Sequence, residues 1–402
     1  NGRNPSIVLD GSDGDLTIPA TVTFVTSQSR AGAVLNEAGN NTILGNFTLT
    51  SGDGATHIWS KAGKLTLAGR LTPNTDSRQL YLRGDGEGEI SGVITNGGTT
   101  AGLPLYRDVG SGTWTLSGSN TYSGSTTVSA GTLAVAGANG SISASSPLAV
   151  SGGGALVVSN TAAANHADRL GNAAAITLSN GTLAFVNDGS AANFAETVGA
   201  VSLSSGTNRV LSAQAAENQT SVLTLSGLSR SGSATVDFVG VGIGTSDRNR
   251  IFIAGQPDGL IGSWATINGV APAFYSSARG VYLPSSIIAA KGDVLVDGSA
   301  EVVIQTEGSG GPDALSAAVT SIGSLLQNSA YTSTVDTAAK TLRVDKVTIS
   351  PLMANLTLGL AANDGTVTPA TPGGELALAN NSDSATLAVN AAIADNAAAS
   401  PL

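Results

Sequence analysis

Three carboxylates alternate with glycine in the segment Gly-Asp-Gly-Glu-Gly-Glu at residues 84–89. In an extended strand, Asp85, Glu87 and Glu89 share one face. Such a row could bind a cation, or it could supply the acid and base that polysaccharide-cleaving β-helix enzymes need. The pattern is also typical of a solvated outer face with the glycines turned inward. We expect this second arrangement, and the sequence leaves open whether the three carboxylates bind a cation.

A second acidic segment, Asp-Gly-Ser-Asp-Gly-Asp, covers residues 10–15 and has the composition of a calcium loop. It lacks the alternating ligand positions of an EF-hand, and Thr21 stands where the final bidentate glutamate would be. We expect a turn, and cation binding by Asp10, Asp13 and Asp15 stays open.

The two histidines give little evidence of catalysis. His57 adjoins Ile58 and Trp59 in a strand pattern, where we expect it only to decorate the strand. His166 lies near Asp168, and with one of many serines the two could form a triad. Because a triad depends on geometry and serine is frequent here, we assign no catalytic, cofactor-binding or metal-binding residue. We predict that the chain is not an enzyme and has no cofactor.

Aromatic side chains could provide a binding surface for glycans. Six of them could form a sugar-stacking strip if several are exposed: Trp59, Trp114, Trp264, Tyr81, Tyr106 and Tyr122. We expect most of them to pack in the interior or at the ends of the fold. A glycan-binding adhesin module is therefore the alternative function, and a polysaccharide-cleaving enzyme on the same fold is a weaker one.

The composition points to β-structure outside an ordinary globular pattern. The chain has 402 residues, a formal charge of −10, 52 glycines, 11% charged residues and no cysteine. The lack of cysteine excludes disulfides and thiolate metal sites. No basic stripe with interleaved aromatics is present, so we expect no nucleic acid partner. No run reaches the roughly 18 apolar residues of a membrane helix, so we expect no membrane insertion by this segment.

The elements that position these residues are short alternating strands. Thr21–Val25 and Gly63–Gly69 alternate large apolar residues with small or polar ones, which predicts strands with one buried face. Glycines recur at the start of such phrases with intervals of 18 to 27 residues, at Gly45, Gly63, Gly88, Gly112, Gly131, Gly154, Gly181, Gly206 and Gly232. This loose period is typical of a parallel β-helix, whose coils pair with the coils above and below. Candidates for a stacked asparagine ladder are Asn40, Asn120, Asn160 and Asn180.

Three segments depart from the strand pattern. Residues 162–175 and 213–218 are rich in alanine and could be short irregular or helical excursions. In residues 312–326, Leu315, Val319, Ile322 and Leu326 have helical spacing, which suits either a helix or a strand entrance followed by a buried strand. The sequence does not decide between the two.

One stretch resembles a known family. Residues 110–135 read Gly-Ser-Gly-Thr-Trp-Thr-Leu-Ser-Gly-Ser-Asn-Thr-Tyr-Ser-Gly-Ser-Thr-Thr-Val-Ser-Ala-Gly-Thr-Leu-Ala-Val. This stretch closely resembles the autotransporter passenger-associated strand repeat. Weaker similarity to the large exported proteins that carry this repeat extends over residues 37–43, 82–94, 259–269 and 390–395. The resemblance implies a right-handed parallel β-helix on a bacterial cell surface, in a protein serving adhesion, biofilm or surface architecture.

The sequence thus predicts an all-β chain, a right-handed parallel β-helix or β-solenoid that forms one continuous rod. We expect N-terminal coils at 1–109, coils with the repeat at 110–240, and C-terminal coils at 241–402 that lead toward a further repeat. We expect an extracellular structural or adhesive protein, one unit of a repeat array or a processed subunit of a fibre. Its expected partners are copies of itself, end to end, or neighbouring repeats of the same polypeptide, with surface glycans as a further possibility.

Overall fold

The structure is a computed structural model, and it describes residues 6–26, 29–50, 55–75, 78–98, 102–244, 248–269, 271–283, 287–290, 292–306 and 310–396. Contacts divide the chain into two compact units, Asn1–Gln256 (unit 1) and Pro257–Leu402 (unit 2). The described part of the chain contains no helix, and its parallel sheets confirm the predicted β-solenoid.

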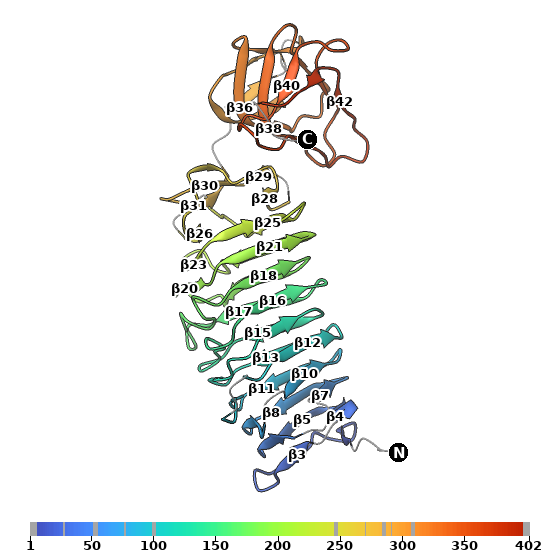
Figure 1. The fold of residues 1–402 in the computed structure, drawn as a ribbon, viewed down its shortest axis with the longest axis vertical. Helices are drawn as coiled ribbons and strands as arrows, with labels where there is room; N and C mark the ends of the chain where they lie inside the picture. Colours follow the sequence, from blue (N-terminus) through green and yellow to red (C-terminus); the bar gives the residue numbers. More distant parts are fainter. Residues whose placement is uncertain are drawn as a thin grey trace. The chain divides into compact units, whose positions relative to one another are not determined.

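Two long parallel sheets run along unit 1, and Figure 1 shows their strands stacked in sequence order. The first sheet contains β1 (Ile7–Asp10), β4 (Ser29–Ala38), β7 (Ala55–Ser60), β10 (Gln79–Arg83), β12 (Leu105–Val109), β14 (Thr126–Val128), β16 (Leu148–Ser151), β18 (Ile176–Ser179), β21 (Val201–Ser205) and β24 (Leu228–Arg230). The second contains β2 (Thr17–Ile18), β5 (Asn40–Ile43), β8 (Lys64–Leu67), β11 (Glu87–Ile90), β13 (Thr113–Leu116), β15 (Thr132–Val135), β17 (Ala155–Asn160), β19 (Thr182–Asn187), β22 (Thr207–Ala213) and β25 (Thr235–Val239).

A third face of unit 1 is a sheet only at its two ends. It contains β3 (Phe24–Thr26), β6 (Phe47–Leu49) and β9 (Leu71–Pro73) at one end, and β20 (Asn193–Val198), β23 (Thr220–Leu225) and β26 (Asn249–Ile253) at the other. Between them the face has isolated bridges, such as Ile142 with Leu170. Residues 162–175 and 214–218 are irregular excursions without helix, while Ala213 is the last residue of β22.

Inward-facing side chains of successive coils stack on one another and fill the core of unit 1. In β13, Trp114 and Leu116 are buried while Thr113 and Thr115 are partly exposed. Strand register places Trp114 between Gly88 of one neighbouring coil and Leu133 of the other. Each inward column therefore continues from coil to coil, which buries apolar area that one coil could not bury alone.

The recurring glycines mostly mark the turn into the second long sheet. Gly63, Gly112, Gly131, Gly154, Gly181 and Gly206 each directly precede one of its strands. The coil spans 19 residues from Thr113 to Thr132 and 27 from Ala155 to Thr182, within the predicted range. Gly45 instead precedes β6 of the third face, so it is not equivalent to the others.

The predicted asparagine ladder is only partly present. Asn120 and Asn160 are buried, whereas Asn40 is exposed and Asn180 occupies a turn with φ of 58°. Among the described strands, one in-register asparagine pair involves a predicted residue, and it joins Asn160 to the buried Asn187 on the next coil.

Unit 2 has a small antiparallel part and a parallel part. The antiparallel part has β27 (Gly259–Leu260), β30 (Phe274–Ser276) and β31 (Gly280–Tyr282), and it also pairs β28 (Ala265–Ile267) with β29 (Ala271–Pro272). One parallel sheet has β32 (Ile287–Ala290), β34 (Ser299–Thr306), β36 (Val319–Gln327), β38 (Thr341–Ile349), β40 (Thr366–Thr368), β41 (Ala377–Asn380) and β43 (Ala392–Ile393). The other has β33 (Val294–Leu295), β35 (Asp313–Leu315), β37 (Ser333–Asp336), β39 (Leu356–Leu358) and β42 (Leu387–Val389).

The helical alternative for residues 312–326 is wrong. The segment forms β35 and most of β36, joined by a turn at residues 316–318. Leu315 and Ile322 both face the core, but they lie in different sheets, while Val319 is 41% exposed. The helical spacing arose because a turn separates two strands that each place an apolar residue inward.

Candidate functional site

Asp85, which precedes β11, and Glu89 on β11 have separate partners and do not converge on one site. The Asp85 carboxylate accepts hydrogen bonds from the Ser111 backbone N–H (2.8 Å) and hydroxyl (3.0 Å). These bonds hold the pKa of the exposed Asp85 carboxyl below its usual value. Glu89 forms an ion pair with Lys64 at 2.6 Å and accepts a bond from the Ser117 hydroxyl. Burial acts to raise the pKa of Glu89, but the bonds from Lys64 and Ser117 outweigh it and lower the pKa.

Residues 10–15 form a turn. Ser12 donates its backbone N–H to Asp10, and hydrogen bonding by Ser12 lowers the pKa of the Asp10 carboxyl. Asp15 instead accepts the backbone N–H of Asn40 on the next coil at 2.7 Å. Within the described residues, no three His, Cys, Asp or Glu side chains are placed to hold a metal ion.

An aromatic stack lies on the outer face of the first long sheet. Rings of His57 and Tyr81 stack with centroids 4.5 Å apart, and those of Tyr81 and Tyr106 at 4.6 Å. Strand register places these three residues in one row. Since each ring covers the face of the next, a sugar ring could not stack between them. His57 is 6% exposed despite pointing outward, so it is part of this stack.

In the neighbouring row on the same face, an arginine side chain covers the aromatic rings. The Arg83 guanidinium lies over the rings of Trp59 (5.5 Å) and Tyr81 (4.8 Å) and donates to both oxygens of the Asp108 carboxylate. Of the remaining predicted strip, Trp114 and Tyr122 are fully buried and Trp264 is half-buried in unit 2. The six aromatics therefore do not form a single exposed strip.

His166 and Asp168 lie together, but not as a catalytic pair. The His166 Nδ1 atom accepts the backbone N–H of Asp168 at 3.3 Å, so its ring binds main chain and not the carboxylate. The imidazole nitrogen that a triad would direct at its acid is thus used in a local turn.

Gly88 provides the space for the largest buried side chain. A Cβ atom at Gly88 would lie 2.3 Å from the indole of Trp114. The Trp114 Nε1 atom donates to the Arg83 carbonyl at 3.1 Å, which satisfies the buried indole. The tryptophan of one coil is therefore matched to a glycine in the preceding coil.

Glycines also surround a buried cation, Arg107. Its side chain is 0% exposed and occupies an inward column between Leu82 and Val128. The guanidinium donates to the carbonyls of Gly84 (3.1 Å), Gly110 (2.8 Å) and Gly112 (2.7 Å), and also to that of Val109. Burial lowers the pKa of Arg107, while nearby Asp108 acts to raise it. Arg107 thus ties the turns of two successive coils together.

This corner coincides with a known repeat. Residues 109–135 match the family model of the passenger-associated-transport-repeat. This segment of the chain is therefore a passenger-associated-transport-repeat. Comparisons with curated proteins and with solved structures gave no significant match. The repeat and the β-solenoid fit an autotransporter passenger domain, and the repeat suggests an exported surface protein.

The structure explains the residues of the repeat by packing. Gly112 must lack a Cβ because one would lie 2.2 Å from the Gly86 carbonyl oxygen. Gly131 has φ of 57° and faces Arg107, whose Nη2 would be 2.3 Å from an added Cβ. Tyr122 is fully buried, its hydroxyl bonds Thr126 at 2.8 Å, and burial raises its pKa to about 12.

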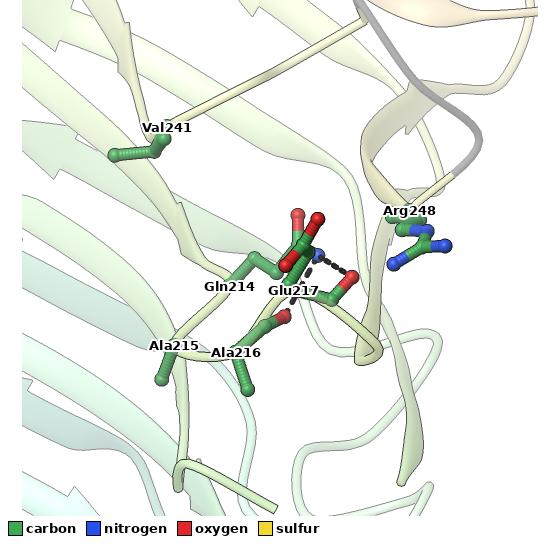
Figure 2. A pocket seen from close by; sticks show the side chains of 6 residues that line it. All are labelled: Gln214, Ala215, Ala216, Glu217, Val241 and Arg248. Atoms are coloured by element: carbon green, nitrogen blue, oxygen red, sulfur yellow. Dashed lines mark hydrogen bonds between the residues drawn. The ribbon is translucent and has the colours of Figure 1, made fainter. Parts of the chain in front are cut away.

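Two shallow pockets occur in the described part of unit 1. One, of about 440 Å³, lies beside the turn at 214–217 and is also lined by Val241 and Arg248 (Figure 2). Figure 2 shows the Gln214 amide turned back onto its own loop, where it donates to the carbonyls of Ala216 and Glu217. The second, of about 550 Å³, lies beside Asp168 and Asn172. The second pocket is also lined by Ser143 and Ser146.

Sequence reasoning missed the buried polar groups that shape unit 1, namely Arg107, Arg169 and Glu196. The alternation along β12 would have predicted that Arg107 points inward, because it lies two residues after the inward Leu105. Among the described residues, no helix is long and apolar enough to cross a membrane.

Proposed function

We propose that this chain is a structural, non-catalytic part of an exported surface protein and that it assembles end to end with other copies of itself. The observation that carries the proposal is an uncovered core at the last described coil. β41, β42 and β43 have core-facing residues, yet no further strand among the described residues pairs with their outer edges.

Register shows that these exposed residues occupy core positions. Leu378 pairs with Val347 and is 42% exposed, whereas Val347 is fully buried. Ile393 pairs with Val367 and is 56% exposed, whereas Val367 is fully buried. An open row of backbone groups beside apolar side chains is a ready template for strand addition.

The first coil of another copy supplies strands of a matching kind. β1, β2 and β3 each lie at the end of their sheets, so one backbone edge of each faces no described strand. Joining the first coil of one copy to the last coil of another is a heterologous contact. Contacts of this kind form open filaments when rotation does not close them into a ring.

The absence of catalysis is supported by the chemistry of the polar residues. Asp85 and Glu89 are held by Ser111 and by Lys64, on different neighbours. The Nδ1 atom of His166 accepts the backbone N–H of Asp168, so this nitrogen does not receive a bond from a catalytic acid. Adhesion and biofilm formation would then be properties of the assembled rod, and glycan binding stays a separate prediction.

Sedimentation velocity over a range of concentrations tests the assembly. We expect the wild-type chain to form larger species as concentration rises, and Ile393→Lys or Leu378→Lys to shift it toward monomer by placing a charge in the contact. Leu352→Lys is the matched control, because Leu352 is 84% exposed on a turn outside the edge strands.

Electron microscopy of the same samples distinguishes end-to-end contacts from sideways aggregation. Filaments that shorten in the Ile393→Lys variant but not in Leu352→Lys would support the proposal. A wild-type chain that stays monomeric at every concentration would contradict it, as would equal effects of the two lysines.

A further inference from the structure

Glu196 is a buried carboxylate at the start of a sheet. It lies on β20, the first strand of the sheet formed by β20, β23 and β26, and it is 1% exposed. Phe194 and Val198 on either side of it also point inward. In the next coil the same column continues with Leu223 and Ile251, which are both buried. An acid thus stands at the head of an apolar column.

The carboxylate binds the backbone of the excursion at residues 161–175. Its Oε1 accepts the N–H groups of Arg169 (3.0 Å) and Leu170 (2.9 Å), and Oε2 makes a longer contact with Arg169 N–H at 3.3 Å. These bonds replace the strand pairing that the third face lacks in this coil. The excursion is therefore fixed to β20 through a side chain that can gain or lose a proton.

Side chains of the same excursion cover the backbone edge of β20. Asn165 donates its amide to the Asn193 carbonyl at 2.9 Å. The Asn172 amide, oriented with its nitrogen toward two acceptors, donates to the Thr197 carbonyl at 2.6 Å and to Asp168 at 3.2 Å. The excursion thus occupies acceptors at both ends of an edge strand that would otherwise be open to pairing.

The Arg169 side chain anchors the excursion to the preceding coils. Its guanidinium is fully buried and donates to Asn160 Oδ1 (2.7 Å), Gly140 O (2.6 Å) and Ala164 O (2.8 Å). It does not bond the Glu196 carboxylate, although its charge acts on that group. The anchor and the carboxylate are consequently separate contacts that can be tested separately.

We propose that residues 161–175 form a pH-controlled cover over the edge of β20, held closed when Glu196 is protonated and loosened when it is ionised. Burial raises the pKa of Glu196 to about 7, against the bonds from Leu170 and Arg169 that act to lower it. When the cover opens, water reaches the carboxyl and its pKa falls toward the ordinary value of about 4.3. Protons therefore favour the closed state.

The charged neighbours of Glu196 give the same direction. Asp168 on the excursion raises its pKa and Arg169 lowers it less strongly, while β23 contributes only the apolar Leu223 beside it. His166 lies in the same excursion and accepts the Asp168 N–H, so the excursion has a second side-chain contact beside that of Glu196. A test has to separate the two groups.

Hydrogen exchange of the Arg169 and Leu170 amides measures the opening directly. We expect protection factors, corrected for intrinsic exchange, to fall about tenfold or more between pH 5 and pH 8. The Ile94 amide is the internal control, because it binds the neutral buried acceptor Asn120 Oδ1 at 3.0 Å. Its protection should not change over this range.

Glu196→Gln makes the sharp prediction. Its oxygen can keep the two short bonds of Oε1, and its amide nitrogen takes the place of the weakly engaged Oε2. We expect the variant to remove the pH dependence and to protect Arg169 and Leu170 better than wild type at pH 8. His166→Asn, which retains a non-titrating acceptor, should leave the pH dependence in place.

Three outcomes would overturn the proposal. The first is equal wild-type protection at pH 5 and pH 8. The second is a loss of protection in Glu196→Gln at both values, which would make the ionised carboxylate the better holder. The third is loss of the pH dependence in His166→Asn, which would transfer the effect to the imidazole.

Discussion

Arg107 and Arg169 are both fully buried in unit 1, but their surroundings differ. Arg107 bonds only main-chain carbonyls, and glycines leave the space for its side chain. Arg169 shares its corner with a side-chain amide and lies beside a buried carboxylate. At the second corner a buried acid, Glu196, accepts the backbone N–H of the arginine, whereas the bonds of Arg107 go to carbonyls alone. A buried arginine can thus hold a turn through bonds to main-chain carbonyls alone, or it can belong to a group of residues that responds to pH.

The difference follows from what each arginine closes. Arg107 joins two regular coils, so rigid carbonyls in fixed turns suffice as acceptors. Arg169 holds an irregular excursion of residues 161–175, which has no strand of its own on the third face. Side chains must replace the missing ladder there, and one of them happens to be an acid.

Arg107→Ala should have the largest effect on the fixed corner. It leaves the carbonyls of Gly84, Gly110 and Gly112 without their buried donor and opens a cavity, so we expect a loss of about 4 kcal/mol in unfolding free energy. Urea unfolding followed by circular dichroism measures it. Arg209→Ala is the control, since Arg209 is exposed on β22. Equal urea midpoints for the two variants would show that the buried bonds of Arg107 add nothing to the stability of the fold.

Gly88→Ala tests whether the Trp114 ring needs the space left by the missing side chain of Gly88. The added methyl would lie 2.3 Å from the Trp114 ring, which is held on both sides by its neighbours. Overpacking of this kind should destabilise the chain by about 3 kcal/mol. Gly189→Ala should change stability little, because nothing lies within 4 Å of its Cβ position. A neutral Gly88→Ala would mean that the indole can move aside.

The pH dependence of stability sharpens the contrast at the second corner. Since the folded-state pKa of Glu196 is raised to about 7, the folded chain binds this proton more readily than the unfolded chain. Its contribution to stability is therefore full below the unfolded pKa and is lost as pH rises through about 7, by about 3 kcal/mol. Melting temperatures of wild type and Glu196→Gln should agree near pH 4.5 and separate by pH 8, with the variant higher. A variant that melts lower than wild type at pH 8 would reverse the sign.

Much of the fold was predictable because the same pattern of alternating strands and glycines recurs in each coil of a solenoid. Alternation placed Trp114 and Leu116 inward, and the glycines before β13 and β15 marked the coil boundaries. Residues 312–326 could not be decided, because apolar residues on two strands with a turn between them match helical spacing. The end of the expected transition to a further repeat, at 397–401, lies outside the described residues.

The buried polar sites were less predictable for a physical reason. Glu196 and Arg169 are brought together by an excursion whose path no periodicity describes. Whether a charge on a strand faces inward depends on register, and register at an irregular coil depends on the length of that coil. For Asp85 and Glu89 the expectation of an outer face agrees with their exposure, and their cation binding stays a prediction.

Tyr122→Phe should have the smallest effect, and it tests whether neutral polar groups in the repeat behave as the buried arginines do. The Tyr122 hydroxyl bonds Thr126, but Thr126 keeps a second partner in Ser145 at 2.8 Å. Removing the hydroxyl therefore leaves no orphaned acceptor, and we expect a loss of only about 1 kcal/mol. Tyr331→Phe, at a residue 48% exposed, is the control and should be neutral. A loss as large as that of Arg107→Ala would show that the buried hydroxyl of Tyr122 stabilises the fold as strongly as the buried cation does.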